Sequence, residues 1–261
     1  MYNIANIKLK INNYLEDEFL EKFRCARPEI FKADCEVELV KTEVRFHGAE
    51  CYRLNKSSNI ISRIGKDVMI VNERWEKATI LPVENDYSIH CFFLEMFYAH
   101  AVQRHMLQIH SSLIEHQGRG LLFLGPSGIG KTTQAELWAK YRNALIINGD
   151  IVFVQETKEC FLGWGTPWHG SSPYCENTSV PVHAMVVLKQ AEENSIRELT
   201  GFEKVSEVSN SIFYPQWLEN GMELCLETLD HLLREIPVYE LSCRPDEAAV
   251  ELTEQTIFYR K

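Results

Sequence analysis

Short apolar segments separated by turn residues fill the chain before about residue 88. Each segment spans only a few positions, and polar or glycine-containing stretches such as His47–Glu50 and Gly65–Asp67 lie between them. Short runs of this kind are typical of strands joined by hairpins. The pattern therefore predicts a meander or small sheet with strands at Val37–Val40, Val44–Phe46, Cys51–Leu54, Val68–Val71 and Ala78–Leu81.

The apolar period changes from Ser88 onward. Apolar and aromatic residues such as Phe92, Met96 and Phe97 then recur at helical spacing up to about Met106. Steps of three and four residues place such side chains on one helix face. The segment is therefore predicted to be a helix whose aromatic face packs in a core.

Beyond this helix, apolar strands alternate with helical patterns. Strands are predicted at Gln108–Glu115, Leu121–Leu124 and Ala144–Ile147, with a turn at Arg119–Gly120 and a helix over Thr132–Tyr141. Further strands are expected at Val182–Leu188 and Pro237–Leu241, and further helices near Phe202–Ile212, Pro215–Arg234 and Asp246–Thr256. This alternation is typical of an α/β sheet. We expect a β-rich N-terminal part, residues 1–88, and an α/β domain, residues 89–261.

Composition and charge argue against several classes of protein. A formal net charge of -10 disfavours non-specific binding to nucleic acid or to an anionic membrane. No apolar run approaches the length of a membrane span, and the first residues lack the pattern of a signal peptide. The eight cysteines form no C-x-x-C pair, so reduced thiols are expected. These features predict a cytoplasmic protein that binds neither nucleic acid nor membranes.

The strongest chemical signal is the glycine loop, Gly125–Thr132, which fits the pattern G-x-x-x-x-G-K-[ST] between a predicted strand and a predicted helix. In such loops the backbone N–H groups and the helix N-terminus point at phosphate oxygens. Lys131 would reach the β- and γ-phosphates of ATP, and the Thr132 hydroxyl would bind Mg²⁺. The predicted nucleotide-binding residues are Gly125, Ser127, Gly128, Ile129, Gly130, Lys131, Thr132 and Thr133.

Asp150 is the best candidate for chemistry outside the loop. It follows the strand Ala144–Ile147 in the sequence Asn148-Gly149-Asp150, at the carboxyl end where ligands bind in open α/β sheets. There it could hold Mg²⁺ or accept the proton of an attacking hydroxyl. Asn-Gly-Asp is also favourable turn chemistry, and the two roles are compatible. His110, alone on a buried strand, fits either a core residue or a catalytic group.

Two other segments carry unusual residues. Gly163–Ser172 combines tryptophans, glycines, a proline and His169, which favours an irregular loop that is either a binding loop or a surface loop fixed by its aromatic residues. Arg244 is either a solvated side chain or an arginine that reaches a phosphate. Asp246 is a plausible N-cap for the last helix.

These motifs together resemble the C-terminal kinase domain of HPr kinase/phosphorylase. The resemblance rests on His110-Ser111-Ser112-Leu113-Ile114, the turn at Gly118–Gly120, the glycine loop and the strand that ends in Asn148-Gly149-Asp150. The chain resembles still more the smaller HPr-kinase-like proteins found beside peptide-modification genes, also in its Gly-Thr-Pro-Trp segment and in Val238–Val250. The superfamily includes ATP-dependent phosphoenolpyruvate carboxykinase. The sequence departs at Gly149, where HPr kinases carry the first of two adjacent aspartates.

The resemblance implies a P-loop kinase core that moves the γ-phosphate of ATP to a serine hydroxyl. The expected catalytic residues are Asp150 as base, Lys131, and His110 near the phosphates, with Thr132 and Asp150 at Mg²⁺. The acceptor is expected to be a serine of a peptide, protein or small molecule. A carboxykinase-like or pyrophosphate-linked transfer is a second hypothesis, and a nucleotide-binding regulatory partner with little turnover is a third. HPr kinases form hexamers, which leaves a homo-oligomer open here.

Overall fold

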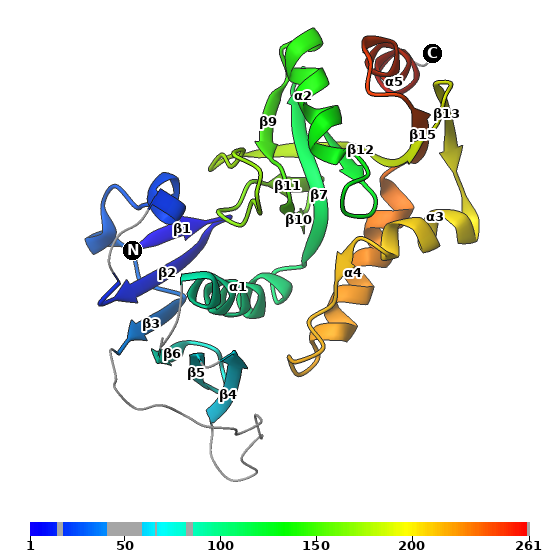
Figure 1. Cartoon of the computed structure of the whole chain (residues 1–261). Helices are drawn as coiled ribbons and strands as arrows, with labels where there is room; N and C mark the ends of the chain where they lie inside the picture. Colours follow the sequence, from blue (N-terminus) through cyan, green and yellow to red (C-terminus); the bar gives the residue numbers. More distant parts are fainter. Residues whose placement is uncertain (15–17, 41–58, 66, 82–85, 260–261) are drawn as a thin grey trace. The chain divides into compact units, whose positions relative to one another are not determined.

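The structure is a computed structural model that describes residues 1–14, 18–40, 59–65, 67–81 and 86–259 (Figure 1). Contacts within the chain divide it into two compact units, Met1–Ala101 and Val102–Lys261. The first unit therefore contains all but the last residue of helix α1 (Asp86–Val102), which the apolar pattern predicts at the start of the α/β part. The strands predicted at Val44–Phe46 and Cys51–Leu54 lie outside the described residues. No helix in the described ranges is long and apolar enough to cross a membrane.

The first unit contains a six-stranded sheet in the order β1-β2-β3-β6-β5-β4. Strand β2 is parallel to β3 and β3 is parallel to β6, whereas the other neighbours are antiparallel. The strands are β1 (Tyr2–Ile4), β2 (Ile7–Asn12), β3 (Cys35–Leu39), β4 (Asn59–Ile64), β5 (Asp67–Asn72) and β6 (Lys77–Leu81). Two 3₁₀ helices, Glu18–Phe23 and Pro28–Ile30, precede β3, and helix α1 (Asp86–Val102) follows β6.

Sequence reasoning missed the hairpin of β1 and β2. Its turn is made by Ala5 and Asn6, whose φ angles are 45° and 64°. Two consecutive positive φ angles are the geometry of a tight hairpin turn, but Ala-Asn is a weak sequence signal for it. Strand β2 buries Ile7 and Leu9 and leaves the alternating Lys8 and Lys10 partly exposed, which is the pattern of a strand with one buried face.

The second unit is built on a nine-stranded sheet. Its main order is β11-β10-β7-β8-β12-β15-β13, and β9 and β14 also pair with β7. Strand β12 is parallel to β8 and to β15, and the other pairings are antiparallel. The strands are β7 (Met106–His116), β8 (Arg119–Leu124), β9 (Leu145–Asn148), β10 (Ile151–Glu156), β11 (Phe161–Trp164), β12 (Ser179–Gln190), β13 (Ser195–Leu199), β14 (Ile212–Phe213) and β15 (Val238–Cys243). The fold is therefore mixed α/β with two sheets.

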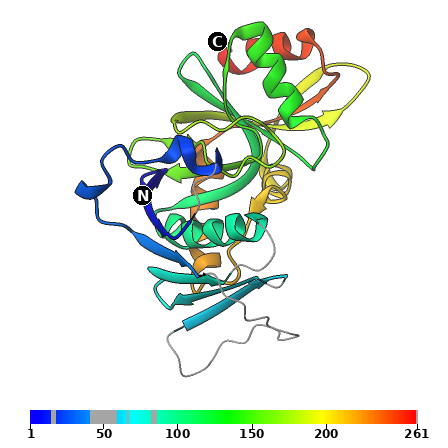
Figure 2. The same ribbon diagram turned by 60° about the vertical axis from the view of Figure 1, so that its left-hand side comes forward.

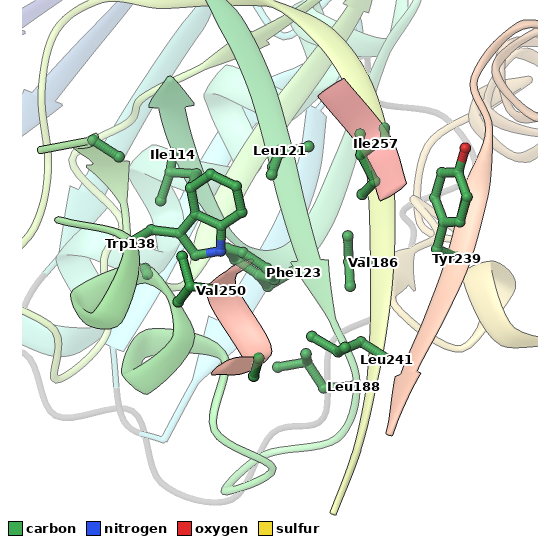
Figure 3. Packing of buried hydrophobic residues seen from close by; sticks show 14 of the residues in the cluster. Ile114, Leu121, Phe123, Trp138, Val186, Leu188, Tyr239, Leu241, Val250 and Ile257 are labelled. Atoms are coloured by element: carbon green, nitrogen blue, oxygen red, sulfur yellow. The ribbon is translucent and has the colours of Figure 1, made fainter. Parts of the chain in front are cut away.

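Four helices complete the second unit: α2 (Lys131–Arg142), α3 (Gly201–Ser209), α4 (Gly221–Glu235) and α5 (Glu247–Phe258). The predicted N-cap of α5 is confirmed, because the Asp246 carboxylate accepts a hydrogen bond from the Ala249 amide at 3.0 Å. Helices α2 and α5 lie side by side at one end of this unit (Figure 2). Both contribute to a core with β7, β8, β12 and β15 (Figure 3).

That core fixes the two elements that border the glycine loop. Phe123 on β8 and Trp138 on α2 are fully buried in it, with Val186 of β12 and Val250 of α5 (Figure 3). Burial of large side chains on both elements holds the end of β8 and the start of α2 in fixed positions. The loop that joins them therefore stands on a rigid support.

Three sequence predictions in the second unit need correction. The turn predicted at Arg119–Gly120 is wrong, because these residues belong to β8 and the hairpin turns at Gln117 and Gly118, with φ angles of 53° and 73°. The pattern also extended α3 to Ile212, which belongs to strand β14. Gly163 and Trp164, expected in an irregular loop, lie in β11.

Candidate functional site

The glycine loop lies between β8 and α2, as the sequence predicts. The backbone leaves β8 at Leu124 and enters the helix at Lys131. Gly125, Gly128 and Gly130 have φ angles of 135°, 79° and 111°, which side-chain-bearing residues rarely adopt. The glycines thus let the chain curl tightly in front of the N-terminus of α2, where helical N–H groups have no partner within the helix.

Lys131 and Thr132 occupy the first turn of α2. The Lys131 ammonium donates hydrogen bonds to the carbonyl oxygens of Gly125 and Pro126, at 3.1 and 3.2 Å. Burial lowers the pKa of this ammonium below the usual value for lysine, and the negative charge of Asp150 opposes that shift. The Thr132 hydroxyl donates to the Gly149 carbonyl at 3.4 Å. The loop is therefore tied directly to the turn that carries Asp150.

Asp150 lies in a tight turn between β9 and β10. Its amide donates to the Asn148 side-chain oxygen at 2.9 Å, which is the Asx-type turn that the sequence suggested. Strand β10 pairs antiparallel with β7 so that Ile151 stands opposite His110. This register brings His110 Nε2 to 3.2 Å from Asp150 Oδ1, and both side chains are partly exposed. The lone histidine is thus placed beside the predicted base.

The segment after β11 is anchored to the same turn. The Thr166 hydroxyl donates to the Ile151 carbonyl at 2.8 Å, and the Asn148 side-chain Nδ2 donates to the Thr166 carbonyl at 2.9 Å. The Ile151 amide donates to the carbonyl of the buried Trp168 at 3.2 Å. These hydrogen bonds place the residues that follow Trp168 beside Asp150, where they border a cavity. Whether the segment is a binding loop stays a prediction.

The residue at position 149 has no room for a side chain. A β-carbon built on Gly149 would lie 1.9 Å from the Ser172 hydroxyl oxygen and 2.5 Å from its β-carbon. An aspartate therefore cannot occupy this position while Ser172 keeps its place. Ser172 thus occupies the space that a side chain at position 149 would need, where HPr kinases carry an aspartate.

One cavity of about 560 Å³ joins these elements. The loop and α2 form one part of its wall, and the Asp150 turn and the segment after β11 form the rest. Its lining residues are His110, Ser127, Gly128, Gly130, Lys131, Thr132, Thr133, Glu136, Gly149, Asp150, His169, Ser171, Ser172 and Pro173. Of the predicted nucleotide-binding residues, Ile129 lines a neighbouring cavity instead, and Gly125 contributes the carbonyl that Lys131 binds.

Sequence reasoning missed Glu136 in this cavity. Its carboxylate accepts a hydrogen bond from the Tyr174 hydroxyl at 3.2 Å. Glu136 follows Thr132 by four residues on α2, so helical periodicity alone places the two on one face. Ser172 and Pro173 carried no individual signal, because their position depends on the anchoring of the whole segment.

The hydroxyl and carboxylate oxygens of the cavity are ligands that suit a hard cation bound together with phosphates. Among the described residues, no group of three or more His, Cys, Asp or Glu side chains could enclose a metal ion. Mg²⁺ in nucleotide sites needs no such cage, because water and substrate phosphates fill most of its positions. The Thr132 hydroxyl and the Asp150 carboxylate, both on this cavity, match that requirement.

A second cavity of about 350 Å³ lies beside the loop and shares Gly128, Gly130 and Thr133 with the first. Its other lining residues include Ile129, Gln134, Leu188, Cys243, Arg244 and Pro245. The Gln134 amide donates to the Cys243 thiol at 3.2 Å, and burial raises the pKa of that thiol to about 11. The Arg244 guanidinium is mostly exposed, and its Nε lies 3.2 Å from the Asp246 carboxylate.

Comparisons with known proteins give one family match and one similar solved structure. A family model described as SynChlorMet cassette protein ScmC matches residues 84–257. No curated protein matches the chain. One similar solved structure is the Hpr(Ser) kinase/phosphatase from Coxiella burnetii, with a TM-score of 0.37 and 10% identity, covering 58% of this chain and 97% of that one. The residues matched by the family model include every residue that lines either cavity.

Proposed function

This chain belongs to the family of SynChlorMet cassette protein ScmC, and we propose that it is an ATP- and Mg²⁺-dependent kinase. In this proposal a phosphoryl group moves from ATP to a hydroxyl, that of a serine in a peptide, protein or small molecule. The observation that carries the proposal is the cavity in which the glycine loop and Lys131 share one space with the Asp150–His110 pair.

The loop side of the cavity supports phosphate binding. The N-terminus of α2 offers N–H groups and the positive end of the helix dipole. Lys131 now binds two loop carbonyls, and phosphate oxygens would replace these as stronger, charged partners. The loop and Lys131 would thus hold the phosphates of the nucleotide, and the shared border with the second cavity lets the nucleoside extend there.

The Asp150 side of the cavity supports activation of the acceptor. Its Oδ1 is engaged by His110, which holds the carboxylate in position. The carboxylate would orient the acceptor hydroxyl and accept its proton, a contribution of about 10²–10⁴-fold in rate. Thr132 and Asp150 would hold Mg²⁺, which when bound neutralises charge on the phosphates.

A dicarboxylate substrate, as in a carboxykinase, is less well supported. Recognition of two carboxylates requires several cationic groups. Among the described residues that line the cavity, Lys131 is the one lysine or arginine, and the phosphates would engage it. The cavity therefore favours a neutral hydroxyl acceptor.

A nucleotide-binding regulatory partner is the second candidate function, and the Gly149 turn favours it. Because Ser172 packs on Gly149, the turn offers one carboxylate, that of Asp150, both to bind Mg²⁺ and to accept the proton of the acceptor hydroxyl. If one group cannot serve both, ATP binds but is not consumed. Loss of ATP that depends on an acceptor separates the two candidates.

Two substitutions test the proposed roles separately. We expect Lys131→Ala to weaken binding of a fluorescent ATP analogue by roughly tenfold or more, which is about 1.4 kcal/mol. We expect Asp150→Asn to bind the analogue like the wild type but to lose at least about 10²-fold in the rate of transfer.

Matched controls for these variants are available on exposed surfaces. Lys140 lies on the same helix over the Tyr141 ring, and Asp230 pairs with Arg234 on α4. Lys140→Ala and Asp230→Asn should behave like the wild type. Transfer at the native rate in Asp150→Asn would show that the assignment of the base is wrong.

A further inference from the structure

We propose that Ser171 is a phosphorylation site of the protein itself, modified in cis by the transfer reaction described above. This inference rests on the proposed kinase function and goes one step beyond it. It states that the chain carries an acceptor hydroxyl inside its own active cavity, on the segment that borders Asp150.

The two oxygens of the Asp150 carboxylate face different partners. Oδ1 lies 3.2 Å from His110 Nε2. Oδ2 faces Gly170, because a β-carbon built on Gly170 would lie 2.4 Å from Oδ2 and 2.9 Å from the carboxyl carbon. The oxygen that His110 leaves available is thus directed at the backbone of Gly170, immediately before Ser171.

The two serines of this segment, Ser171 and Ser172, differ in how far their side chains are buried. Ser172 is 8% exposed, its hydroxyl accepts a hydrogen bond from the Tyr174 amide at 3.3 Å, and it packs on Gly149. Ser171 lines the same cavity with an exposed side chain. Of these two serines, Ser171 is the one whose side chain is exposed on the cavity.

The segment is held at the site from both ends. Upstream, the carbonyl of Trp168 accepts from the Ile151 amide, and downstream the carbonyl of Tyr174 accepts from the Gly149 amide at 3.2 Å. Ser171 is therefore held at the wall of the cavity that contains Asp150, without a separate binding step. An acceptor on the same chain has a high effective concentration, which favours its reaction.

The step is a simple phosphoryl transfer. Ser171 Oγ attacks the γ-phosphorus of ATP, and the bond from that phosphorus to the bridging oxygen breaks, so that ADP leaves. The hydroxyl proton passes to Asp150 Oδ2 and then to solvent. The products are phosphoserine at position 171, ADP and one proton.

The modification would limit itself. A phosphoserine carries about -1.5 to -2 charges at neutral pH. Placed beside the Asp150 carboxylate, it repels that carboxylate and fills the acceptor side of the cavity. We therefore expect one phosphate per chain and slower transfer to external acceptors after modification.

The test uses the full chain after phosphatase treatment, incubated with Mg²⁺ and ATP. Intact mass and peptide mapping should show one added phosphoryl group at Ser171. Ser171→Ala should lose the added mass with an unchanged thermal midpoint, Ser171→Thr should regain it as phosphothreonine, and the exposed control Ser195→Ala should match the wild type. The rate per chain should stay constant over a tenfold range of protein concentration, as a cis reaction requires.

Several results would overturn the inference, and they differ from failure of the kinase function. Phosphate mapped to another residue, or full mass gain in Ser171→Ala, would reject Ser171 as the site. A rate that rises with protein concentration would reject transfer in cis. Unmodified protein that consumes ATP with an external acceptor would reject self-phosphorylation and keep the kinase. A wild type that binds no fluorescent ATP analogue would reject both.

Discussion

Lys131 is the residue whose burial bears most directly on the proposed binding of nucleotide. The residue is 7% exposed, and two carbonyl oxygens replace part of the water that its ammonium has lost. Such partners compensate desolvation incompletely, which is why its pKa is lowered. Phosphate oxygens are negatively charged and would compensate the desolvation better, which supports the proposal that Lys131 binds phosphate.

This environment predicts a coupling between nucleotide binding and protonation of Lys131. Bound phosphates would raise the lowered pKa of Lys131. ATP should therefore bind most tightly at pH values below the pKa that Lys131 has in the free protein. The affinity for ATP should then fall as the pH rises above the Lys131 pKa of the free protein. It should level off above the higher Lys131 pKa of the ATP complex. Titration of a fluorescent ATP analogue at increasing alkaline pH measures the effect.

The control for this coupling is Lys131→Arg, which keeps the charge because arginine stays protonated throughout this range. Its affinity should not change with pH over the same interval. An equal pH dependence in both proteins would assign the titration to another group.

The sequence predicted which residues meet in the cavity wherever a single contiguous motif contains them. Gly128, Lys131 and Thr132 are placed by a contiguous pattern, so their location in the cavity followed directly. The pairing of His110 with Asp150 could not be predicted from spacing, because it depends on the register between β7 and β10. Ser172 could not be predicted either, since it meets Gly149 only through the folded segment after β11.

At the element scale, the segment after β11 positions the Asp150 carboxylate. Gly170 has a φ angle of 60°, and any β-carbon there meets Asp150 Oδ2. Gly118 has a similar φ angle of 73° in the β7–β8 turn, but nothing lies within 4 Å of a β-carbon built on it. An alanine at Gly118 would therefore introduce backbone strain alone, whereas an alanine at Gly170 would add displacement of the Asp150 carboxylate.

We predict that Gly170→Ala lowers phosphoryl transfer by on the order of 10²-fold, because the methyl group pushes Asp150 out of position. Gly118→Ala should keep the native rate. Both variants should lose a similar stability, about 1–2 kcal/mol, from the left-handed backbone conformation. Turnover assays combined with urea unfolding measure the two effects, and equal turnover in the two variants would contradict this role of Gly170.

Elements with a strong apolar pattern were predicted well, and those without one were missed. The buried strands β7, β8 and β12 are long apolar runs, helix α1 is rich in apolar residues, and the start of α2 is given by the glycine-loop motif. Strand β13 exposes most of its residues, Ser195–Leu199, and so carries little apolar signal. Strand β11 contains Gly163 and Trp164, which as residue types indicate a loop. Its pairing with β10 and β12 overrides that local preference.

At the scale of the whole molecule, the chain divides into two units, and the site lies entirely within Val102–Lys261. That unit has a core of its own, centred on residues of the sheet, α2 and α5. The sequence predicted an α/β domain here, but it did not predict how many strands pair antiparallel. Strand direction is set by connections such as the β7–β8 hairpin, which short-range patterns specify weakly.

Trp138 is the side chain on which this core should depend most. It is fully buried, and its ring contacts the rings of His116 and Phe258 at centroid distances of 5.3 and 5.8 Å. Trp138→Ala should lower the free energy of unfolding by about 3–5 kcal/mol. The indole N–H has no hydrogen-bond partner among the described residues, so Trp138→Phe should cost distinctly less.

Urea unfolding followed by circular dichroism measures these differences, with Leu226→Ala on the exposed side of α4 as the control. That control should change the stability by well under 1 kcal/mol. Equal losses in Trp138→Ala and Leu226→Ala would show that Trp138 does not support the core.

The most direct test of the kinase function is ³¹P NMR of the full chain with Mg²⁺ and ATP. Acceptors are added in excess over protein: free serine, serine-containing peptides and an HPr-type protein, with Asp150→Asn as the control. We predict a new phosphoester signal that grows beyond the protein concentration with one class of acceptor and is absent in the variant. ATP that stays bound and unconsumed with every acceptor, and without any, would contradict the kinase and favour the nucleotide-binding regulatory partner.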